Sequence, residues 1–354
     1  MASSSDAPGS VTAAVRPAVT VSAAVAGGWR RAAGAWLAIV GLVAAGALFT
    51  LPATVLLARA IERDLGASLM ADRVAAGTDL VWWDEFAYRN APPSFTPAII
   101  GGAAPLGTYS DLLDGDAPPA DALAAAAVAG AAWLFLSGGL LERLARRRRL
   151  GTRAFLAGCG ALFFRLLRLA LIAGVFYAVL LGPVHDWIFD GLYPWLTRDT
   201  TVERRAFVWR AALYLLWLAP VLAVNLLADY AKVRLVIEDR RSVLGALVAA
   251  GRFLRRHAGS AVAVYAINAV AAGVVLLLYL ILAPGGRGGD WRLLAALAIG
   301  FAYLFARLLV RAAFLGSAMT LFEGRLAHAA FTAPPVPVWP DSPAAEAIDN
   351  AART

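Results

Sequence analysis

The chain has 354 residues, of which 60% are apolar and 16% charged, with a formal net charge of +8. Soluble domains have roughly 45–50% apolar residues, so this composition indicates an integral membrane protein and not one or two soluble domains. Lys232 is the one lysine, and the arginines flank apolar segments, which argues against nucleic acid as a partner. Cys159 is the one cysteine, which excludes an internal disulfide and a cysteine-based metal cluster.

Six segments are predicted to cross the membrane, since about 20 apolar residues span the hydrocarbon core. The predicted spans are about 34–58, 122–141, 165–184, 208–228, 261–284 and 292–313. The predicted fold class is therefore all-α, a polytopic membrane protein with one six-helix domain at 29–331. Residues 1–28 and 332–354 lack a periodic apolar face and are predicted to be disordered cytoplasmic tails.

The positions of the arginines predict how the helices are oriented. Segment 142–153 holds six arginines and one acidic residue, and segment 229–257 holds seven basic and three acidic residues. The loop at 61–121 holds three arginines and ten acidic residues. Because basic loops remain in the cytoplasm, we expect both termini inside and a helical extracytoplasmic cap at 61–121. Abundant alanine, glycine and arginine favour the inner membrane of a bacterium.

Few residues in the chain point to catalysis. No nucleotide-binding, zinc-protease or nucleophile-elbow motif is present, so we expect no cofactor and no resident metal. The strongest candidate is an outer cluster of Asp84, Glu85, His185 and Asp186, which could bind a divalent metal or act as an acid and base on a lipid head group. The alternative, which we favour, is that neighbouring tryptophans anchor the cap and the acids are solvated.

A run of four arginines, Arg146, Arg147, Arg148 and Arg149, follows the second predicted span. Basic residues at this position attract anionic lipids, by about 1 kcal/mol per residue near the surface. The run also sets the orientation of the helices, and that role alone is enough to account for it.

Arg307 and Arg311 lie four residues apart, on one face of the sixth predicted span. Arg307 follows fourteen uncharged residues, which places it about 22 Å from the outer end of the helix. A charge at that depth is costly unless it pairs, reaches the interface or lines a cavity. Asp229 lies where the fourth span ends, and we predict a structural ion pair of Asp229 with Arg307 or Arg311. A solute pathway and an arginine that reaches the interface are the alternatives.

Segment 230–256 is predicted to be a cytoplasmic amphipathic helix along the membrane surface. Its apolar side would consist of Val233, Val236, Ile237, Leu244, Leu247 and Leu254. Its solvated side would consist of Arg234, Glu238, Arg241, Arg252 and Arg256. Such a helix would contact anionic lipids or a protein partner.

Two stretches, "ALVAAGRFLRR" (246–256) and "RLLVRAAFLGSAMTLFE" (307–323), resemble uncharacterised six-helix bacterial membrane-protein families. Those families are loosely similar to the membrane domain attached to some glycerophosphodiester phosphodiesterases. The resemblance covers about a third of the chain and implies a fold without an activity. "GALVAAGRF" (245–253) is also similar to the ATPase-docking helix of ABC-importer permeases, but it lacks their acidic start.

We therefore expect a multi-pass membrane protein without identifiable catalytic chemistry, acting as a transport-related or scaffold component. A membrane-embedded enzyme that uses the outer cluster is one alternative. A permease subunit that needs a separate ATPase is the other.

Overall fold

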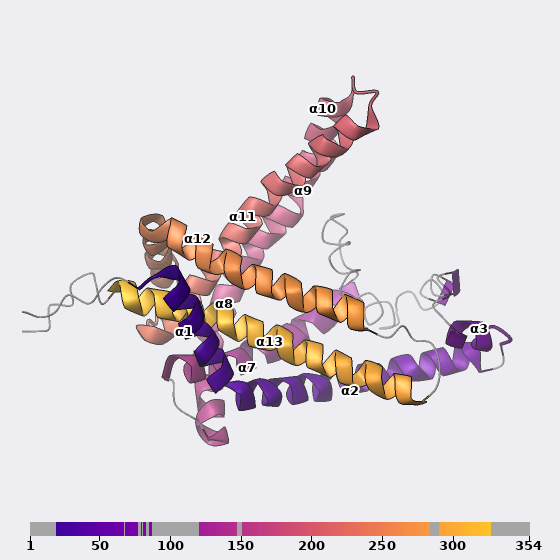
Figure 1. The fold of residues 1–354 in the computed structure, drawn as a ribbon, viewed down its shortest axis with the longest axis horizontal. Helices are drawn as coiled ribbons and strands as arrows, with labels where there is room; N and C mark the ends of the chain where they lie inside the picture. Colours follow the sequence, from indigo (N-terminus) through magenta and orange to yellow (C-terminus); the bar gives the residue numbers. More distant parts are fainter. Residues whose placement is uncertain are drawn as a thin grey trace, which may run out of the picture.

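The computed structural model describes residues 19–66, 68–76, 79, 81–82, 85–86, 120–146, 151–283 and 290–326. Every regular element in these ranges is a helix, which confirms an all-α fold for them (Figure 1). The elements are α1 (Val21–Gly34), α2 (Trp36–Leu65), α3 (Ala71–Ala76), α7 (Ala120–Arg146), α8 (Thr152–Leu181), α9 (Pro183–Asp186), the π-helix η1 (Trp187–Leu192), α10 (Tyr193–Thr197), α11 (Glu203–Ile237), α12 (Val243–Leu282) and α13 (Asp290–Leu326).

Four stretches of helix are long and apolar enough to cross a membrane. They are Thr152–Thr197, Glu203–Ile237, Val243–Leu282 and Leu294–Arg325. The pair Val21–Gly34 and Trp36–Phe49, bent by 62°, is a fifth candidate if it forms one span. The described helices thus provide four or five candidate spans where the sequence predicted six. α7 covers the predicted second span, but the side chains of its residues 120–127 lie outside the described part.

The prediction of a disordered N-terminal tail as far as residue 28 is wrong for its last part, because α1 begins at Val21. The Thr20 hydroxyl accepts a hydrogen bond from the Ala23 backbone nitrogen at 3.3 Å, which caps the helix. Ala24, Gly28 and Ala32 recur every four residues and are buried, so one face of α1 belongs to the core. The predicted tails at 1–18 and 332–354 lie outside the described residues, as does most of the predicted cap.

One end of the helices holds the main hydrophobic core, and we call it the core end. Its buried side chains come from residues 24–42, 140–144, 162–169, 230–235, 243–264 and 312–322. Away from this end the helices diverge, and the hairpin of α8 and α11 leaves the pair of α12 and α13 (Figure 1). Only 6–17% of the most apolar window of each of the four candidate spans is buried. The described residues therefore leave most of the surface of these spans uncovered, which is consistent with contact to a lipid bilayer.

A smaller cluster holds the far end of the α8–α11 hairpin together. Phe189 of η1 and Trp217 of α11 are buried there with Ile188 and Leu213. The Trp217 indole nitrogen donates a 2.7 Å hydrogen bond to the Leu180 carbonyl of α8. The hairpin therefore has its own packing, separate from the core end.

The predicted continuous surface helix at 230–256 is interrupted between α11 and α12. α11 ends at Ile237, and Ser242 caps α12 by accepting a hydrogen bond from the Gly245 backbone nitrogen at 3.1 Å. Asp239, in the link, has a φ of 44°, a left-handed conformation that aspartate tolerates better than most residues. Arg165 of α8 donates a 2.5 Å hydrogen bond to Asp239 and lowers the pKa of that carboxyl group. This contact ties the link to α8.

The predicted solvated side of segment 230–256 is also corrected. Arg234, expected in solvent, is buried, and its guanidinium lies 4.8 Å from the ring centroid of Phe322. Leu244, expected on the apolar side, is 66% exposed. After a break in helical geometry at His257, the rest of α12 continues as the candidate span. Residues 243–256 therefore form a separate segment with one face exposed. Its other face is buried, through Val243, Ala246, Ala249, Ala250 and Phe253.

The crossing of α1 over α13 has no room for an extra methyl group. A Cβ added to Gly28 would lie 2.0 Å from the Ser317 hydroxyl oxygen and 2.3 Å from the Ser317 backbone nitrogen. We expect Gly28→Ala to lower the free energy of unfolding by about 1–3 kcal/mol, because the backbone of α13 cannot rotate away. Thermal unfolding of the purified protein in detergent measures this.

Gly41→Ala on α2 is the matched control, since no heavy atom lies within 4 Å of its added Cβ. We expect it to leave stability unchanged or to raise it by up to about 1 kcal/mol, through helix propensity. Equal losses in the two variants would show that the α1–α13 crossing is not closely packed.

Candidate functional site

Asp229 of α11 is the central acidic group of the core end. It is only 4% exposed, and the Arg311 guanidinium of α13 donates to both of its carboxylate oxygens, at 2.7 and 2.6 Å. The Lys232 ammonium donates a third hydrogen bond, at 3.0 Å. Two parallel bonds from one guanidinium are the strong geometry for such a pair. Of the two pairs predicted from the sequence, the structure contains Asp229–Arg311.

A second set of polar contacts joins α1, α7 and α13. The Arg31 guanidinium binds the Glu323 carboxylate at 2.6 and 3.3 Å and also reaches the Leu144 carbonyl at 3.5 Å. Arg143 of α7 donates to the Gly34 carbonyl at the bend between α1 and α2. Sequence reasoning missed these residues, although Arg31 directly precedes the first uncharged run and Glu323 is an acid within the last helix.

A small cavity of about 10 Å³ lies beside Asp229, between α11, α12 and α13. Tyr230 and Tyr265 both line it, and Tyr265 accepts a 2.5 Å hydrogen bond from the Asn225 side chain. The buried Tyr230 hydroxyl has no hydrogen-bond partner among the described residues. The cavity has the volume that one water molecule needs, roughly 10–15 Å³. That size leaves no room for a substrate in this cavity.

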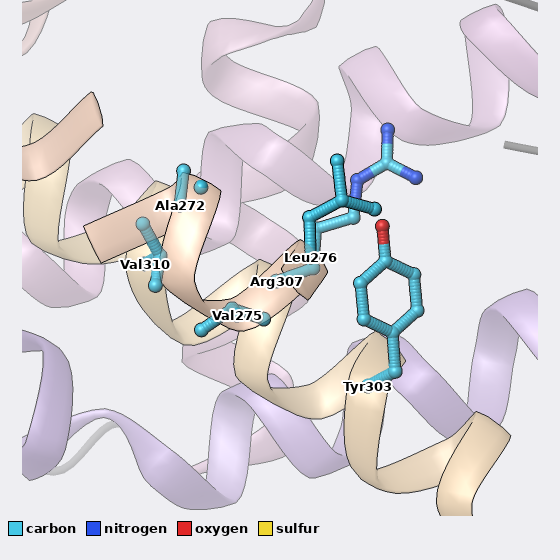
Figure 2. A pocket seen from close by; sticks show the side chains of 7 residues that line it. Ala272, Val275, Leu276, Tyr303, Arg307 and Val310 are labelled. Carbon is cyan, nitrogen blue, oxygen red and sulfur yellow. The ribbon is translucent and has the colours of Figure 1, made fainter. Parts of the chain in front are cut away.

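Arg307 lies elsewhere, in a cavity of about 190 Å³ between α12 and α13 (Figure 2). The side chain is exposed, and no ion pair of Arg307 occurs among the described residues. Tyr303, one turn earlier on α13, shares the cavity and stacks on Tyr279 of α12 with ring centroids 4.3 Å apart. The two arginines of the sixth predicted span therefore have different surroundings.

The outer acidic cluster is not assembled within the described part of the chain. His185 is 6% exposed and packs against Phe189 and Trp217, with ring centroids 4.6 and 5.3 Å away. Its Nδ1 lies 3.7 Å from the carboxylate of Asp186, which is exposed. Glu85 is exposed and follows α3, which lies apart from α9 in Figure 1. Asp84 lies outside the described residues, and the described ones contain no group of three potential metal ligands.

Of the predicted basic run, the structure describes Arg146 and leaves Arg147, Arg148 and Arg149 outside. Arg146 pairs with Glu142 one turn earlier on α7. A surface pair of this kind contributes about 0.3–0.5 kcal/mol, so contact of the run with anionic lipid stays a prediction.

Comparison of the chain with known protein families, curated proteins and solved structures found no match. The resemblance to six-helix bacterial families therefore stays a hypothesis. Function has to be inferred from the ion pairs of the core end, the cavity at Arg307 and the exposed helix faces.

Replacing Asp229 tests whether the pair with Arg311 holds α11 against α13. Breaking a buried pair costs about 3–5 kcal/mol, so Asp229→Arg should greatly reduce the yield of folded protein. Adding Arg311→Asp should restore part of that yield, because the exchanged charges can pair again. The rescue should be incomplete, because Lys232 would then face a like charge at position 229. Size-exclusion chromatography in detergent reports the folded fraction.

Adding Arg307→Asp to Asp229→Arg is the matched control, and we expect it to restore nothing. Rescue by Arg307→Asp instead of Arg311→Asp would contradict the assignment of the pair.

Proposed function

We propose that the chain is a multi-pass inner-membrane protein of a bacterium that acts as a scaffold or interaction component without catalysis. The proposal rests on where the polar and the apolar contacts of the described helices lie. The core and its ion pairs lie at one end, while the candidate spans diverge and expose apolar side chains. Such a molecule positions membrane helices and presents surfaces.

The arginine distribution supports a cytoplasmic location of the core end. The segments at 142–153 and 229–257, rich in arginine, border helices whose buried residues form that end. Because basic segments remain in the cytoplasm, we infer six spans with both termini inside and residues 61–121 outside. The resemblance to six-helix bacterial families agrees with this arrangement.

The surface through which the scaffold acts is inferred to be the outward face of residues 243–256. Leu244 and Val248 are 66% and 59% exposed there, beside the exposed Arg252, Arg255 and Arg256. Apolar side chains among arginines fit a protein partner whose face is apolar and acidic. The opposite face of the segment packs on the core, so the core end holds this surface in place.

The two alternative functions have less support. A lipid-acting enzyme would need His185 free to act, whereas its ring is buried among aromatic side chains. A permease would need a passage through the bundle, and the lining of the Arg307 cavity comes from two helices only.

A photo-reactive residue at position 244 or 248 tests the scaffold proposal in native membranes. We expect a discrete protein adduct whose yield falls roughly tenfold when Arg252→Glu and Arg255→Glu are added, since two surface ion pairs contribute up to about 1 kcal/mol each. Immunoblotting of the cross-linked membranes measures the yield.

Positions 274 and 278, exposed on α12 beyond the break at His257, serve as controls that should cross-link to lipid. Identical adducts at all four positions, or lipid adducts alone at 244 and 248, would contradict the scaffold proposal.

A further inference from the structure

Arg307 is a cation whose partner the described part of the chain does not supply. Arg311, one turn away, is neutralised by Asp229, and Arg31 by Glu323. Arg307 is exposed within the candidate span Leu294–Arg325 and forms no ion pair with a described residue. A guanidinium in that position is costly unless an anion or water accompanies it. An anion from outside the chain would provide this compensation.

The cavity at Arg307 has one polar and one apolar end. Figure 2 shows the Arg307 guanidinium and the Tyr303 hydroxyl together at one end, beside Leu276, while Ala272, Val275 and Val310 lie at the other. The guanidinium and the phenol can both donate hydrogen bonds to a phosphate oxygen. The aliphatic side chains can contact a hydrocarbon chain. The lining therefore offers contacts to both the anionic and the apolar part of an amphiphilic anion.

The size and position of the cavity favour a lipid over a soluble ligand. Its volume of about 190 Å³ is below the roughly 300–1,000 Å³ of sites that enclose a small molecule. It can hold part of a ligand whose remainder lies in the bilayer. Exposed apolar side chains, Val274, Leu277 and Leu304, occur on the same two helices, so hydrocarbon would already surround the groove.

We propose that this groove between α12 and α13 binds one anionic phospholipid of the bilayer. The phosphate lies on Arg307 and Tyr303, and an acyl chain extends away from the core end, along the exposed Leu277 and Leu304. The proposal rests on the membrane location proposed above and is independent of the surface at Leu244 and Val248. Gly273 lines the groove, and no heavy atom lies within 4 Å of a Cβ added there, so the position has room for a larger side chain.

Lipid titration of the purified protein, followed by native mass spectrometry, tests the groove with phosphatidylglycerol and phosphatidylcholine as probes. The wild type should bind one phosphatidylglycerol more tightly than any phosphatidylcholine. Arg307→Ala should weaken this binding about fivefold, the effect of roughly 1 kcal/mol per basic residue. Gly273→Leu, which keeps the charge and fills the groove, should weaken it to a similar extent.

Arg168→Ala is the matched control, because Arg168 is also an exposed arginine in a candidate span, Thr152–Thr197. It should leave the tight site unchanged. The proposal is overturned if Arg168→Ala weakens binding as much as Arg307→Ala, if phosphatidylcholine binds equally well, or if inorganic phosphate displaces the lipid completely. If Arg307→Ala does not fold, Gly273→Leu and Tyr303→Phe decide the question. Failure here leaves the cross-links at positions 244 and 248 unaffected, so the two proposals fail separately.

Discussion

The pair of Asp229 and Arg311 sets the position of α11 against α13 at the core end. Desolvating two charges costs about as much as their attraction returns, so the pair adds little to the free energy of folding. We infer that its effect is on specificity, because a carboxylate that accepts two guanidinium bonds and one ammonium bond fits one register of the two helices. Sliding α13 by one turn would bring Arg307 to Asp229 and remove Arg311, so the surrounding packing has to select between two arginines.

Small residues provide that selection, because they let α1 and α13 approach closely. Gly27 and Gly28 on α1 lie against Gly316, Ser317 and Thr320 of α13. Between helices in lipid, close backbone contact and hydrogen bonds replace the hydrophobic effect as the source of association. The pair of Arg31 with Glu323 then fixes the same crossing. The ion pairs and the small-residue contact therefore support a single arrangement at the core end.

Hydropathy and charge predicted the features that depend on transfer out of water. A long uncharged run must be helical in lipid. An arginine within a span needs a partner such as a carboxylate, and Asp229 at the end of the fourth predicted span could supply one. α1 was missed because its buried residues are alanine, glycine and one arginine, which give no strong apolar signal. The pair of Arg31 and Glu323 joins residues 292 positions apart, which a single sequence does not connect. The link at 238–242 was missed because a left-handed residue at Asp239 leaves the charge pattern of the segment unchanged.

Arg307 and Arg311 show how one helix face can serve two purposes. Both occur on α13 one turn apart, yet Arg311 meets the carboxylate of α11, while Arg307 meets a groove formed with α12. The helices diverge beyond the core end (Figure 1), so the turn that carries Arg311 still lies within reach of an acid. For the turn that carries Arg307, the described residues provide tyrosine and aliphatic side chains but no carboxylate. A charge in an apolar setting must be compensated. Because the helices diverge, no described carboxylate is within reach of Arg307, and an anion from the bilayer takes the place that Asp229 has at Arg311.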